Sequence, residues 1–232
     1  MIYDQLSSMY DALVKDDEAT QAYVDFVERY RIGSSFLELA CGSGELSIAL
    51  AKLGYVVDAS DISEAMLHQA AQKQGSELLN FFTLDMRNVP SDKAYDHMLC
   101  FCDSMNYLEP EELLLMFQSV YHALHEKGVF MFDMHSRDRL DEFSEEFYEA
   151  GVIENQEYTW SIYSDENRLY HNFVFYDAYA NATYEQHMQY VFAHEAIQKL
   201  LQEVGFEVEV YTDFTKQGIH PGEKYFYVAR KV

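Results

Sequence analysis

The chain contains few of the residues on which several large classes of protein depend. It has three cysteines, three prolines and one tryptophan in 232 residues. No apolar run approaches the roughly 18–20 residues of a membrane helix. The segment Met1–Gln5 also lacks the basic start and apolar core of a signal peptide. We therefore expect a cytoplasmic protein with no membrane partner.

The cysteines do not form a pattern typical of disulfides or metal sites. Cys41, Cys100 and Cys102 are an odd number, and all three fall on predicted buried strands. Reduced core thiols are the expected state of such residues in a cytoplasmic protein. No spacing of cysteine and histidine suggests zinc, so we expect no metal.

Basic residues are scarce relative to acidic ones. Lys and Arg number 16 against 40 Asp and Glu, which gives a formal net charge of −24 at pH 7. Non-specific nucleic-acid binding depends on contacts from Lys and Arg to phosphate, so a nucleic-acid partner is disfavoured. The charge either keeps the protein soluble or attracts a cationic substrate such as an amine.

Apolar residues (49%) and aromatic residues (16%) are plentiful, enough for one large domain or a domain with a subdomain. Apolar strands alternate with amphipathic helices, which predicts a mostly parallel sheet with helices on both faces. We predict strands at Phe36–Ala40, Val56–Asp61, Asn80–Leu84, Tyr95–Phe101, Val129–Asp133, Phe206–Tyr211 and Tyr225–Lys231. Helices are predicted at about 5–31, at Glu45–Lys52, from Ser63, from Pro110, and at His194–Val204 with Gly205 as its cap.

The most informative stretch joins the first predicted strand to the helix that follows it. Glu38 lies four residues before Gly42, Gly44 follows, and Asp61 ends the next apolar run, 19 residues beyond Gly42. Glycines allow a ligand to approach the backbone closely, and an acidic residue at the end of the second strand can bind both ribose hydroxyls. This arrangement is typical of a site for an adenosyl cofactor.

Two residues favour S-adenosylmethionine (SAM) over a dinucleotide. A dinucleotide site uses Gly-x-Gly-x-x-Gly with a pyrophosphate on the helix N-terminus, but here Ser47 occupies the position of the third glycine. Glu45 adds a carboxylate to the first helical turn, close to where a phosphate would bind. A cofactor with a positive charge and no phosphate fits better.

Several motifs in order resemble the class I SAM-dependent methyltransferases over about residues 35–135. They are the glycine motif 38–44, the acidic strand end 57–63 with its following helix start, Thr83–Arg87, the loop after Tyr95–Phe101, and the strand Gly128–Asp133. The resemblance is closest to small-molecule N-methyltransferases of the glycine and amino-sugar type. These share a Ser-Met-Asn-Tyr-Leu-like loop, here at 104–108, and a strand-rich insertion after the fifth strand.

The resemblance implies a fold and a set of cofactor residues. The fold is a Rossmann-like, doubly wound α/β sheet of seven strands, mostly parallel with an antiparallel last strand. In the family, the position of Asp85 binds the adenine amino group, and a backbone N–H beside it binds the ring. The implied residues for binding SAM, or its product S-adenosylhomocysteine, are Glu38, Ala40, Cys41, Gly42, Gly44, Asp61, Ile62, Met66, Asp85, Met86, Phe101 and Tyr107.

Residues 136–192 differ in character from the rest of the chain. A charged helix is predicted at Arg137–Glu149, followed by strands at Gln156–Tyr163, Leu169–Tyr176 and Tyr184–Phe192. Their period-two alternation indicates an antiparallel sheet with one packed face. We expect 136–192 to be an inserted β-rich subdomain that covers the substrate, and 1–135 with 193–232 to form the SAM-binding domain. An exposed aromatic sheet edge offers a homodimer surface, although a monomer is equally compatible.

The expected reaction is transfer of the methyl group of SAM, by in-line displacement, to a small polar acceptor, with amines included. The sequence assigns no catalytic residue, and the candidates are Tyr10, Asn106, Tyr107 and His135. His171 and His187, on alternating strands, are more typical of surface residues. Two alternatives remain open, a dinucleotide-dependent oxidoreductase of similar fold and a SAM-binding protein without turnover.

Overall fold

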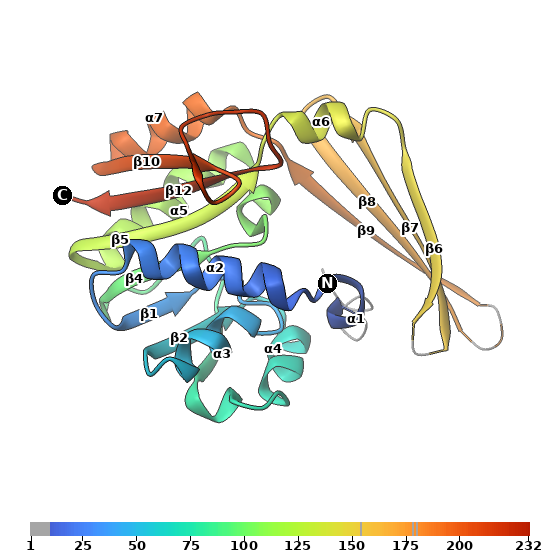
Figure 1. Cartoon of the computed structure of the whole chain (residues 1–232), viewed down its shortest axis with the longest axis horizontal. Helices are drawn as coiled ribbons and strands as arrows, with labels where there is room; N and C mark the ends of the chain where they lie inside the picture. The colour runs from blue at the N-terminus through green and yellow to red at the C-terminus, as the bar shows by residue number, and fades with distance from the viewer. Residues whose placement is uncertain (1–9, 154, 178, 180) are drawn as a thin grey trace.

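The computed structural model describes residues 10–153, 155–177, 179 and 181–232, which form two sheets (Figure 1). The strands of the larger sheet are β1 (Ser35–Glu38), β2 (Val56–Asp61), β3 (Asn80–Thr83), β4 (Tyr95–Cys100), β5 (Leu124–His135), β10 (Phe206–Thr212), β11 (Lys216–Gln217) and β12 (Lys224–Lys231). Their order is β11-β10-β12-β5-β4-β1-β2-β3. Strands β1 to β5 are parallel, and β12 is antiparallel to both β5 and β10.

This sheet confirms the predicted α/β class, but it has eight strands where seven were expected. The extra strand is β11, which pairs with the end of β10 through Tyr211 and Thr212. The chain reverses through Asp213 and Phe214, both with positive φ, and so returns beside β10. Because β11 has only two residues, it carries no periodicity that a sequence pattern could indicate.

Helices cover both faces of the larger sheet. The helices of the described residues are α1 (Tyr10–Val14), α2 (Asp17–Tyr30), α3 (Glu45–Lys52), α4 (Glu64–Ala71), α5 (Pro110–Ala123), α6 (Asp138–Glu142) and α7 (His194–Val204), with the short helices η2 (Ser76–Leu78) and η3 (Ser104–Tyr107). One core cluster joins α2 and α3 to the sheet, and the other joins α5 and α7 to it. The bounds predicted for α3 and α7 are confirmed, as is the left-handed cap of α7 at Gly205.

The N-terminal helical segment is interrupted. Residues 5–9 lie outside the described residues, and the rest forms α1 and α2 with a break at Lys15 and Asp16. The Asp16 carboxylate accepts hydrogen bonds from the backbone N–H groups of Glu18 and Ala19, at 2.8 and 3.0 Å. This is an ordinary N-cap, which starts a new helix at Asp17 and ends the preceding one.

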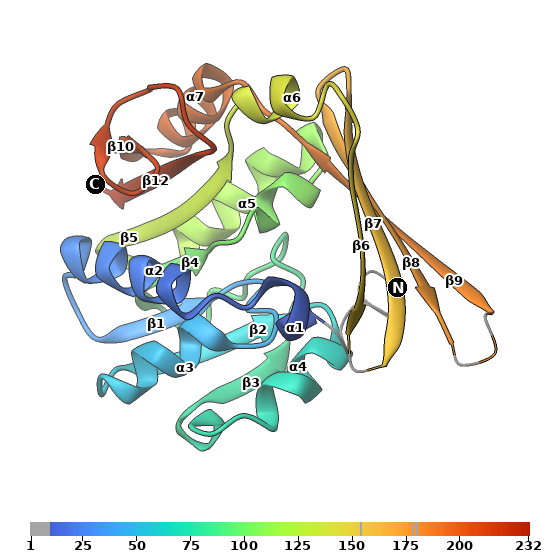
Figure 2. The same cartoon turned by 45° about the vertical axis from the view of Figure 1, so that its right-hand side comes forward.

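The second sheet is antiparallel, and its order is β6 (Phe147–Ile153), β7 (Gln156–Asp165), β8 (Arg168–Tyr176) and β9 (Ala182–Tyr190). The helix predicted at Arg137–Glu149 is wrong beyond Glu142, where α6 ends. Residues 147–153 include two aromatic and two β-branched residues and pair with β7 along its length, so a strand forms there instead. In Figures 1 and 2 this sheet stands beside the larger one, with α6 at one end.

Among the described residues, no helix is both long and apolar enough to cross a bilayer.

Candidate active site

A cavity of about 670 Å³ opens where the parallel strands of the larger sheet end. Ligands bind at this carboxyl edge in open α/β sheets. The second sheet, α1 and the start of α2 also contribute to its wall. The predicted cofactor residues that line it are Glu38, Ala40, Cys41, Gly42, Asp61, Ile62, Met66, Asp85, Met86, Phe101 and Tyr107.

The glycine turn and the end of β2 are joined by hydrogen bonds. Asp61 accepts from the backbone N–H of Gly42 through Oδ2 and from that of Ser63 through Oδ1, both at 2.8 Å. Asp61 is buried, and burial raises its pKa above the ordinary value. The two backbone donors therefore hold this carboxylate in one orientation at the floor of the cavity.

Gly44 does not line the cavity. It is the N-cap of α3, with φ of 77°, and a Cβ placed on it would lie 3.1 Å from the Cβ of Ala70 in α4. Its lack of a side chain therefore serves the turn and the packing of α3 against α4.

Ser47 holds the carboxylate that precedes the glycine turn. Its hydroxyl donates a hydrogen bond to Glu38 Oε2, and both residues are buried. Burial raises the pKa of Glu38 to about 7, although the hydrogen bonds from Ser47 oppose the shift. The serine that replaces the third glycine of a dinucleotide motif thus has a structural partner that glycine could not bind.

Ion pairs hold α1 over the glycine turn. Ser43 donates a hydrogen bond to Asp11 at 2.6 Å, and Lys73 of the α4 end pairs with Asp11 at 2.5 Å and with Glu45 at 2.6 Å. Lys15 lies 3.3 Å from Glu45 as well. Two lysines therefore neutralise Glu45, which had been expected to repel a phosphate. The side chain of Tyr10, at the start of α1, lies outside the described residues.

Asp85 is bound by a neighbouring guanidinium. Arg87 Nε lies 2.8 and 2.9 Å from the two carboxylate oxygens of Asp85, and Arg87 Nη1 pairs with Glu112 at 2.5 Å. The hydrogen bonds from Arg87 lower the pKa of Asp85, so this carboxyl group is ionised at neutral pH.

The loop after β4 places Cys102 and Asp103 in the cavity wall, where the sequence predicted neither. Cys102 and Asp103 have φ of 56° and 60°, a left-handed conformation that few non-glycine residues adopt. Cys102 is consequently exposed after the strand has ended at Cys100, so its predicted place as a buried core thiol is wrong. Cys41 and Cys100 are buried, as predicted.

Asp103 belongs to a partly buried charge cluster with Lys224 of β12. Lys224 Nζ lies 2.6 Å from Asp103 Oδ1 and 3.2 Å from Asp133 Oδ2, and Tyr23 donates to Asp133 at 2.8 Å. Burial would raise the pKa of Asp103, but His135 and Lys224 outweigh it and lower that pKa to about 2. Burial would likewise lower the pKa of Lys224, but Asp103 and Asp133 raise it well above the ordinary value.

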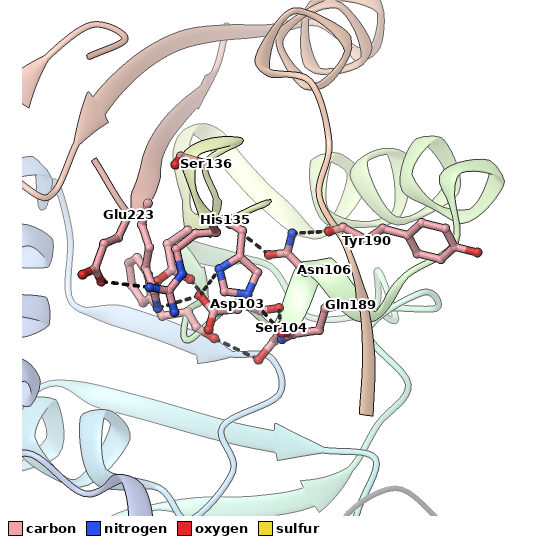
Figure 3. Close-up of polar contacts among 12 residues, drawn as sticks. Asp103, Ser104, Asn106, His135, Ser136, Gln189, Tyr190 and Glu223 are labelled. Carbon is pink, nitrogen blue, oxygen red and sulfur yellow. Dashed lines mark hydrogen bonds and ion pairs between the residues drawn. The ribbon is translucent and has the colours of Figure 1, made fainter. Parts of the chain in front are cut away.

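Two amide side chains join this cluster to the second sheet (Figure 3). His135 Nε2 lies 3.0 Å from Gln189 Oε1, and Gln189 Nε2 donates to the carbonyl of Asp103 at 3.4 Å. Asn106 accepts from the backbone N–H of His135 at 3.2 Å and donates to the carbonyl of Tyr190 at 2.6 Å. Asn106 is fully buried and does not line the cavity, whereas His135 does.

The two histidines predicted as surface residues lie in the cavity wall instead. His187 is 3% exposed, and its Nδ1 lies 3.2 Å from the hydroxyl of Tyr107. Burial lowers the pKa of His171 to about 4, so this imidazole is neutral at pH 7. Trp160 and Phe173 lie beside them, with ring centroids 5.3 Å apart. Alternation shows which residues share a face of a sheet but not which face meets the rest of the molecule.

Solved structures with the same fold are methyltransferases. A SAM-dependent methyltransferase from Clostridium acetobutylicum ATCC 824 aligns with a TM-score of 0.82 at 22% identity, covering 99% of this chain and 98% of that one. The sugar N-methyltransferase KedS8 from Streptoalloteichus sp ATCC 53650 aligns with a TM-score of 0.77 at 19% identity, covering 100% of this chain and 93% of that one. These alignments show the fold.

Sequence relatives decide the family. A methyltransferase-domain model matches residues 36–128. The Bacillus subtilis (strain 168) protein named "Putative methyltransferase YqeM" is 33% identical over 246 residues, covering 100% of this chain and 98% of that protein. A Geobacillus sp. (strain WCH70) protein, also named as a putative methyltransferase, is 32% identical over 247 residues, with both chains covered in full. The chain belongs to the class I SAM-dependent methyltransferases. The dinucleotide-dependent oxidoreductase considered from the sequence is thereby set aside.

The cavity of this methyltransferase fits SAM on its own structural evidence. Its volume of about 670 Å³ lies within the ~300–1,000 Å³ usual for small-molecule sites. Glu38 and Asp61 supply buried carboxylates that suit a cationic, hydroxyl-bearing ligand, and Gly42 leaves the backbone open to it.

Sequence reasoning missed Asp103, Gln189 and Lys224 as cavity residues of the methyltransferase. A signal for Lys224 existed in the order of strands. An antiparallel last strand begins at the edge where the parallel strands end, and Lys224 opens β12 directly opposite His135. Gln189 gave no such signal, because its position depends on how the second sheet docks.

Proposed function

We propose that this methyltransferase transfers the methyl group of SAM to the nitrogen of a small, polar, amine-bearing acceptor. The observation that carries this proposal is Asp103, a carboxylate held ionised in the cavity wall beside His135. Asp103 and Asp133 are two carboxylates that share one lysine, Lys224, and this excess of acidic groups favours an amine, which binds as an ammonium ion, over a neutral hydroxyl group or an anion.

The residues proposed to bind SAM are those predicted from the sequence that line the cavity. Asp61 would accept hydrogen bonds from the ribose hydroxyls, and Asp85 with the backbone of Met86 would bind the adenine. Glu38 and the glycine turn would lie at the methionine end. SAM supplies an electrophilic methyl group that needs no further activation. The chain therefore contributes binding, orientation and exclusion of water. The proposed set is Glu38, Ala40, Cys41, Gly42, Asp61, Ile62, Met66, Asp85, Met86, Phe101 and Tyr107.

Asp103 and His135 can prepare an amine for transfer. An ammonium ion has no lone pair, so it must lose a proton before its nitrogen can act as a nucleophile. The Gln189 carbonyl oxygen accepts a hydrogen bond from His135 Nε2, which assigns the proton to that atom. His135 Nδ1 then lies 3.7 Å from Asp103 Oδ1, the oxygen that Lys224 also contacts. We therefore assign His135 Nδ1 as the proton acceptor.

The second sheet would close the acceptor side of the cavity. Trp160, Ile162, His171 and Phe173 line this wall, and their side chains are largely apolar or, for His171, neutral at pH 7. Such a wall excludes water and accommodates a carbon skeleton behind the amine. We propose on this basis that 136–192 is the substrate-covering subdomain, with 1–135 and 193–232 forming the SAM-binding domain.

The deciding experiment is turnover with matched acceptors. The purified chain, SAM and a panel of glycine, amino sugars and alkylamines, each paired with the hydroxyl analogue of the same skeleton, would be assayed for S-adenosylhomocysteine. We expect product with at least one amine and none with its hydroxyl partner. Methylation of hydroxyl compounds only would contradict the amine assignment. SAM binding without turnover on any acceptor would favour the SAM-binding protein without catalysis.

Two variants separate the halves of the site. Asp103→Asn should reduce turnover with the amine at least 10-fold and leave the affinity for S-adenosylhomocysteine within 2-fold of the parent. Asp61→Asn should weaken that affinity instead. If Asp103→Asn left the turnover unchanged, Asp103 would not be the amine-binding carboxylate.

A further inference from the structure

Three polar side chains between η3 and β9 form a chain of hydrogen bonds that starts in the cavity wall. Tyr107 ends η3, and its hydroxyl lies 3.2 Å from His187 Nδ1 on β9. His187 Nε2 lies in turn 2.8 Å from Glu185 Oε1, two residues earlier on the same strand. The side chains of His187 and Glu185 are 2% and 11% exposed, and Tyr107 and His187 both line the cavity. A carboxylate is thus connected to a cavity hydroxyl through one buried imidazole.

Glu185 determines which nitrogen of His187 carries the proton. A carboxylate accepts hydrogen bonds and donates none, so the contact with Glu185 assigns the proton of the neutral imidazole to Nε2. Nδ1 then presents a lone pair, and the Tyr107 hydroxyl donates its hydrogen to that lone pair. The rings of Tyr107 and Phe173 pack at steep angles against the imidazole, with centroids 6.0 and 5.8 Å from its own. The direction of the Tyr107 O–H bond is therefore fixed.

This direction matters for an amine that is about to be methylated. A neutral amine has one lone pair, which forms the new C–N bond as the methyl–sulfur bond of SAM breaks and its electron pair stays on sulfur. A hydroxyl that donated its hydrogen to this lone pair would block it. A hydroxyl whose hydrogen is held elsewhere presents its oxygen instead, and that oxygen can accept from an N–H of the amine and help to aim the lone pair.

Tyr107 and Asp103 are close enough to act on the same amino group. Asp103 directly precedes η3 and Tyr107 is its last residue, so the rise of a 3₁₀ helix places their Cα atoms roughly 8 Å apart. Both residues line the cavity. Gln189, two residues after His187 on β9, also donates to the Asp103 carbonyl, so one strand holds both ends of η3.

We propose that Glu185 and His187 are positioning residues that hold the hydroxyl hydrogen of Tyr107, so that Tyr107 Oη accepts a hydrogen bond from an N–H group of the amine acceptor. The proposal rests on the amine acceptor proposed above and narrows its class. Primary and secondary amines carry an N–H beside the lone pair, whereas a neutral tertiary amine does not. The acceptor is therefore a primary or secondary amine, and methylation stops at the tertiary amine.

The first test is the tautomer of His187, measured by ¹⁵N–¹H NMR on the full-length protein at pH 7 with and without S-adenosylhomocysteine. The His187 signals are identified as those that His187→Leu lacks. We expect a proton on Nε2 and a bare Nδ1 in the parent. Glu185→Gln should populate the Nδ1-protonated form, because an amide can donate to Nε2 as well as accept from it. A proton on Nδ1 in the parent would overturn the proposal.

The second test is turnover with an amine that the parent methylates. His187→Leu leaves the Tyr107 hydroxyl able to donate to the amine lone pair, and it should lower kcat about 10-fold. The double variant Tyr107→Phe/His187→Leu removes that hydroxyl and should recover to the higher kcat of Tyr107→Phe. A double variant as slow as His187→Leu would show a merely structural role for His187 and overturn the proposal.

Controls and outcomes keep the two proposals apart. Tyr184→Phe is the matched control, because it removes a hydroxyl from the opposite side of β9, where Tyr184 is 59% exposed. Binding of S-adenosylhomocysteine reports on folding, and Glu185→Gln, which keeps its size, replaces His187→Leu if that variant does not fold. A parent that methylates no amine would contradict the amine assignment. The Nδ1-protonated tautomer in an active parent would contradict only the role of Glu185 and His187.

The degree of methylation provides a third reading. The parent should convert primary and secondary amines of one skeleton and show at least a 10-fold lower kcat/KM for the tertiary amine, with no quaternary product by mass spectrometry. Tyr107→Phe should narrow this difference, because phenylalanine accepts no hydrogen bond from an N–H group. Equal kcat/KM values for the secondary and tertiary amines in the parent would contradict the role of Tyr107 as an N–H acceptor.

Discussion

Arg87 and Asp85 form an ion pair in which the guanidinium reaches both oxygens of the carboxylate. The two residues are separated by Met86 only, and Glu112 of α5 holds the other end of the guanidinium at 2.5 Å. Asp85 is the carboxylate expected to bind the adenine. Arg87 therefore sets its orientation, and Glu112 of α5 in turn holds Arg87 in place.

Replacing Arg87 should weaken cofactor binding. Arg87→Met removes the bidentate partner and leaves Asp85 free to rotate, and a partly exposed pair of this kind contributes about 0.5–1 kcal/mol. We expect the affinity for S-adenosylhomocysteine to fall about 2- to 5-fold by calorimetry. Glu112→Gln, which leaves the Arg87–Asp85 pair in place, should have a smaller effect. An Arg87→Met variant that bound as tightly as the parent would show that the pair does not orient Asp85.

Asp61 has two functions that one substitution can reveal. Asp61→Ala removes the acceptor for the backbone N–H groups of Gly42 and Ser63, and an unsatisfied buried donor costs about 1–3 kcal/mol. We expect a lower free energy of unfolding in urea together with a loss of SAM binding. Asp61→Asn retains one acceptor oxygen and should recover part of the stability. Undiminished SAM binding by a folded Asp61→Ala variant would disprove the assignment of β2.

The stability of the cofactor-free protein should depend on Glu38. Its pKa is raised from 4.5 to about 7 in the folded state, so the folded protein holds this proton more tightly than the unfolded chain does. The contribution is fully present below about pH 4.5 and is lost as the pH rises through about 7. A shift of this size corresponds to roughly 3 kcal/mol.

The measurement is urea unfolding of the parent and of Glu38→Gln at pH 5 and pH 8. The parent should lose more stability than the variant between these values, because glutamine does not titrate. Parallel pH profiles would show that Glu38 is not protonated in the folded protein.

Removing the cation from the partly buried cluster of Lys224, Asp103 and Asp133 should destabilise the fold. Lys224→Met leaves Asp103 and Asp133 without their shared partner, and breaking a buried pair costs about 3–5 kcal/mol. Because Lys224 retains 23% exposure, we expect about 2–3 kcal/mol. Asp133→Asn in the same chain should restore part of the loss. Thermal unfolding followed by circular dichroism measures both variants, and equal melting temperatures of parent and Lys224→Met would refute the cluster's role.

Local signals in the sequence account for much of the larger sheet and its helices. The bounds of Glu45–Lys52 and His194–Val204 follow from flanking glycines, and Ser63 caps α4 with its own hydroxyl. Strand β6 was missed because charged residues before it suggested a continuing helix. Its strand conformation depends on pairing with β7, which local sequence does not encode.

In the candidate site, too, some residues could be predicted from local sequence and others depend on long-range packing. Residues of the glycine turn and of the β2 end are close in sequence order and could be predicted from spacing. The Asp103–Lys224 pair could not, because these residues are far apart in the sequence and meet only when β12 enters the sheet beside β5. His171 and His187 required knowledge of which face of the second sheet docks against the larger one.

The contact that Asn106 makes between the two sheets tolerates substitution of the side chains at positions 135 and 190. Asn106 binds the main-chain carbonyl of Tyr190, and its contact with His135 is also to the main chain. Neither bond depends on which side chains positions 135 and 190 carry. Substitutions along the cavity side of β7 and β8 can therefore accumulate over evolutionary time without breaking these two hydrogen bonds. A lineage could in this way exchange one acceptor for another while inheriting the same cofactor apparatus.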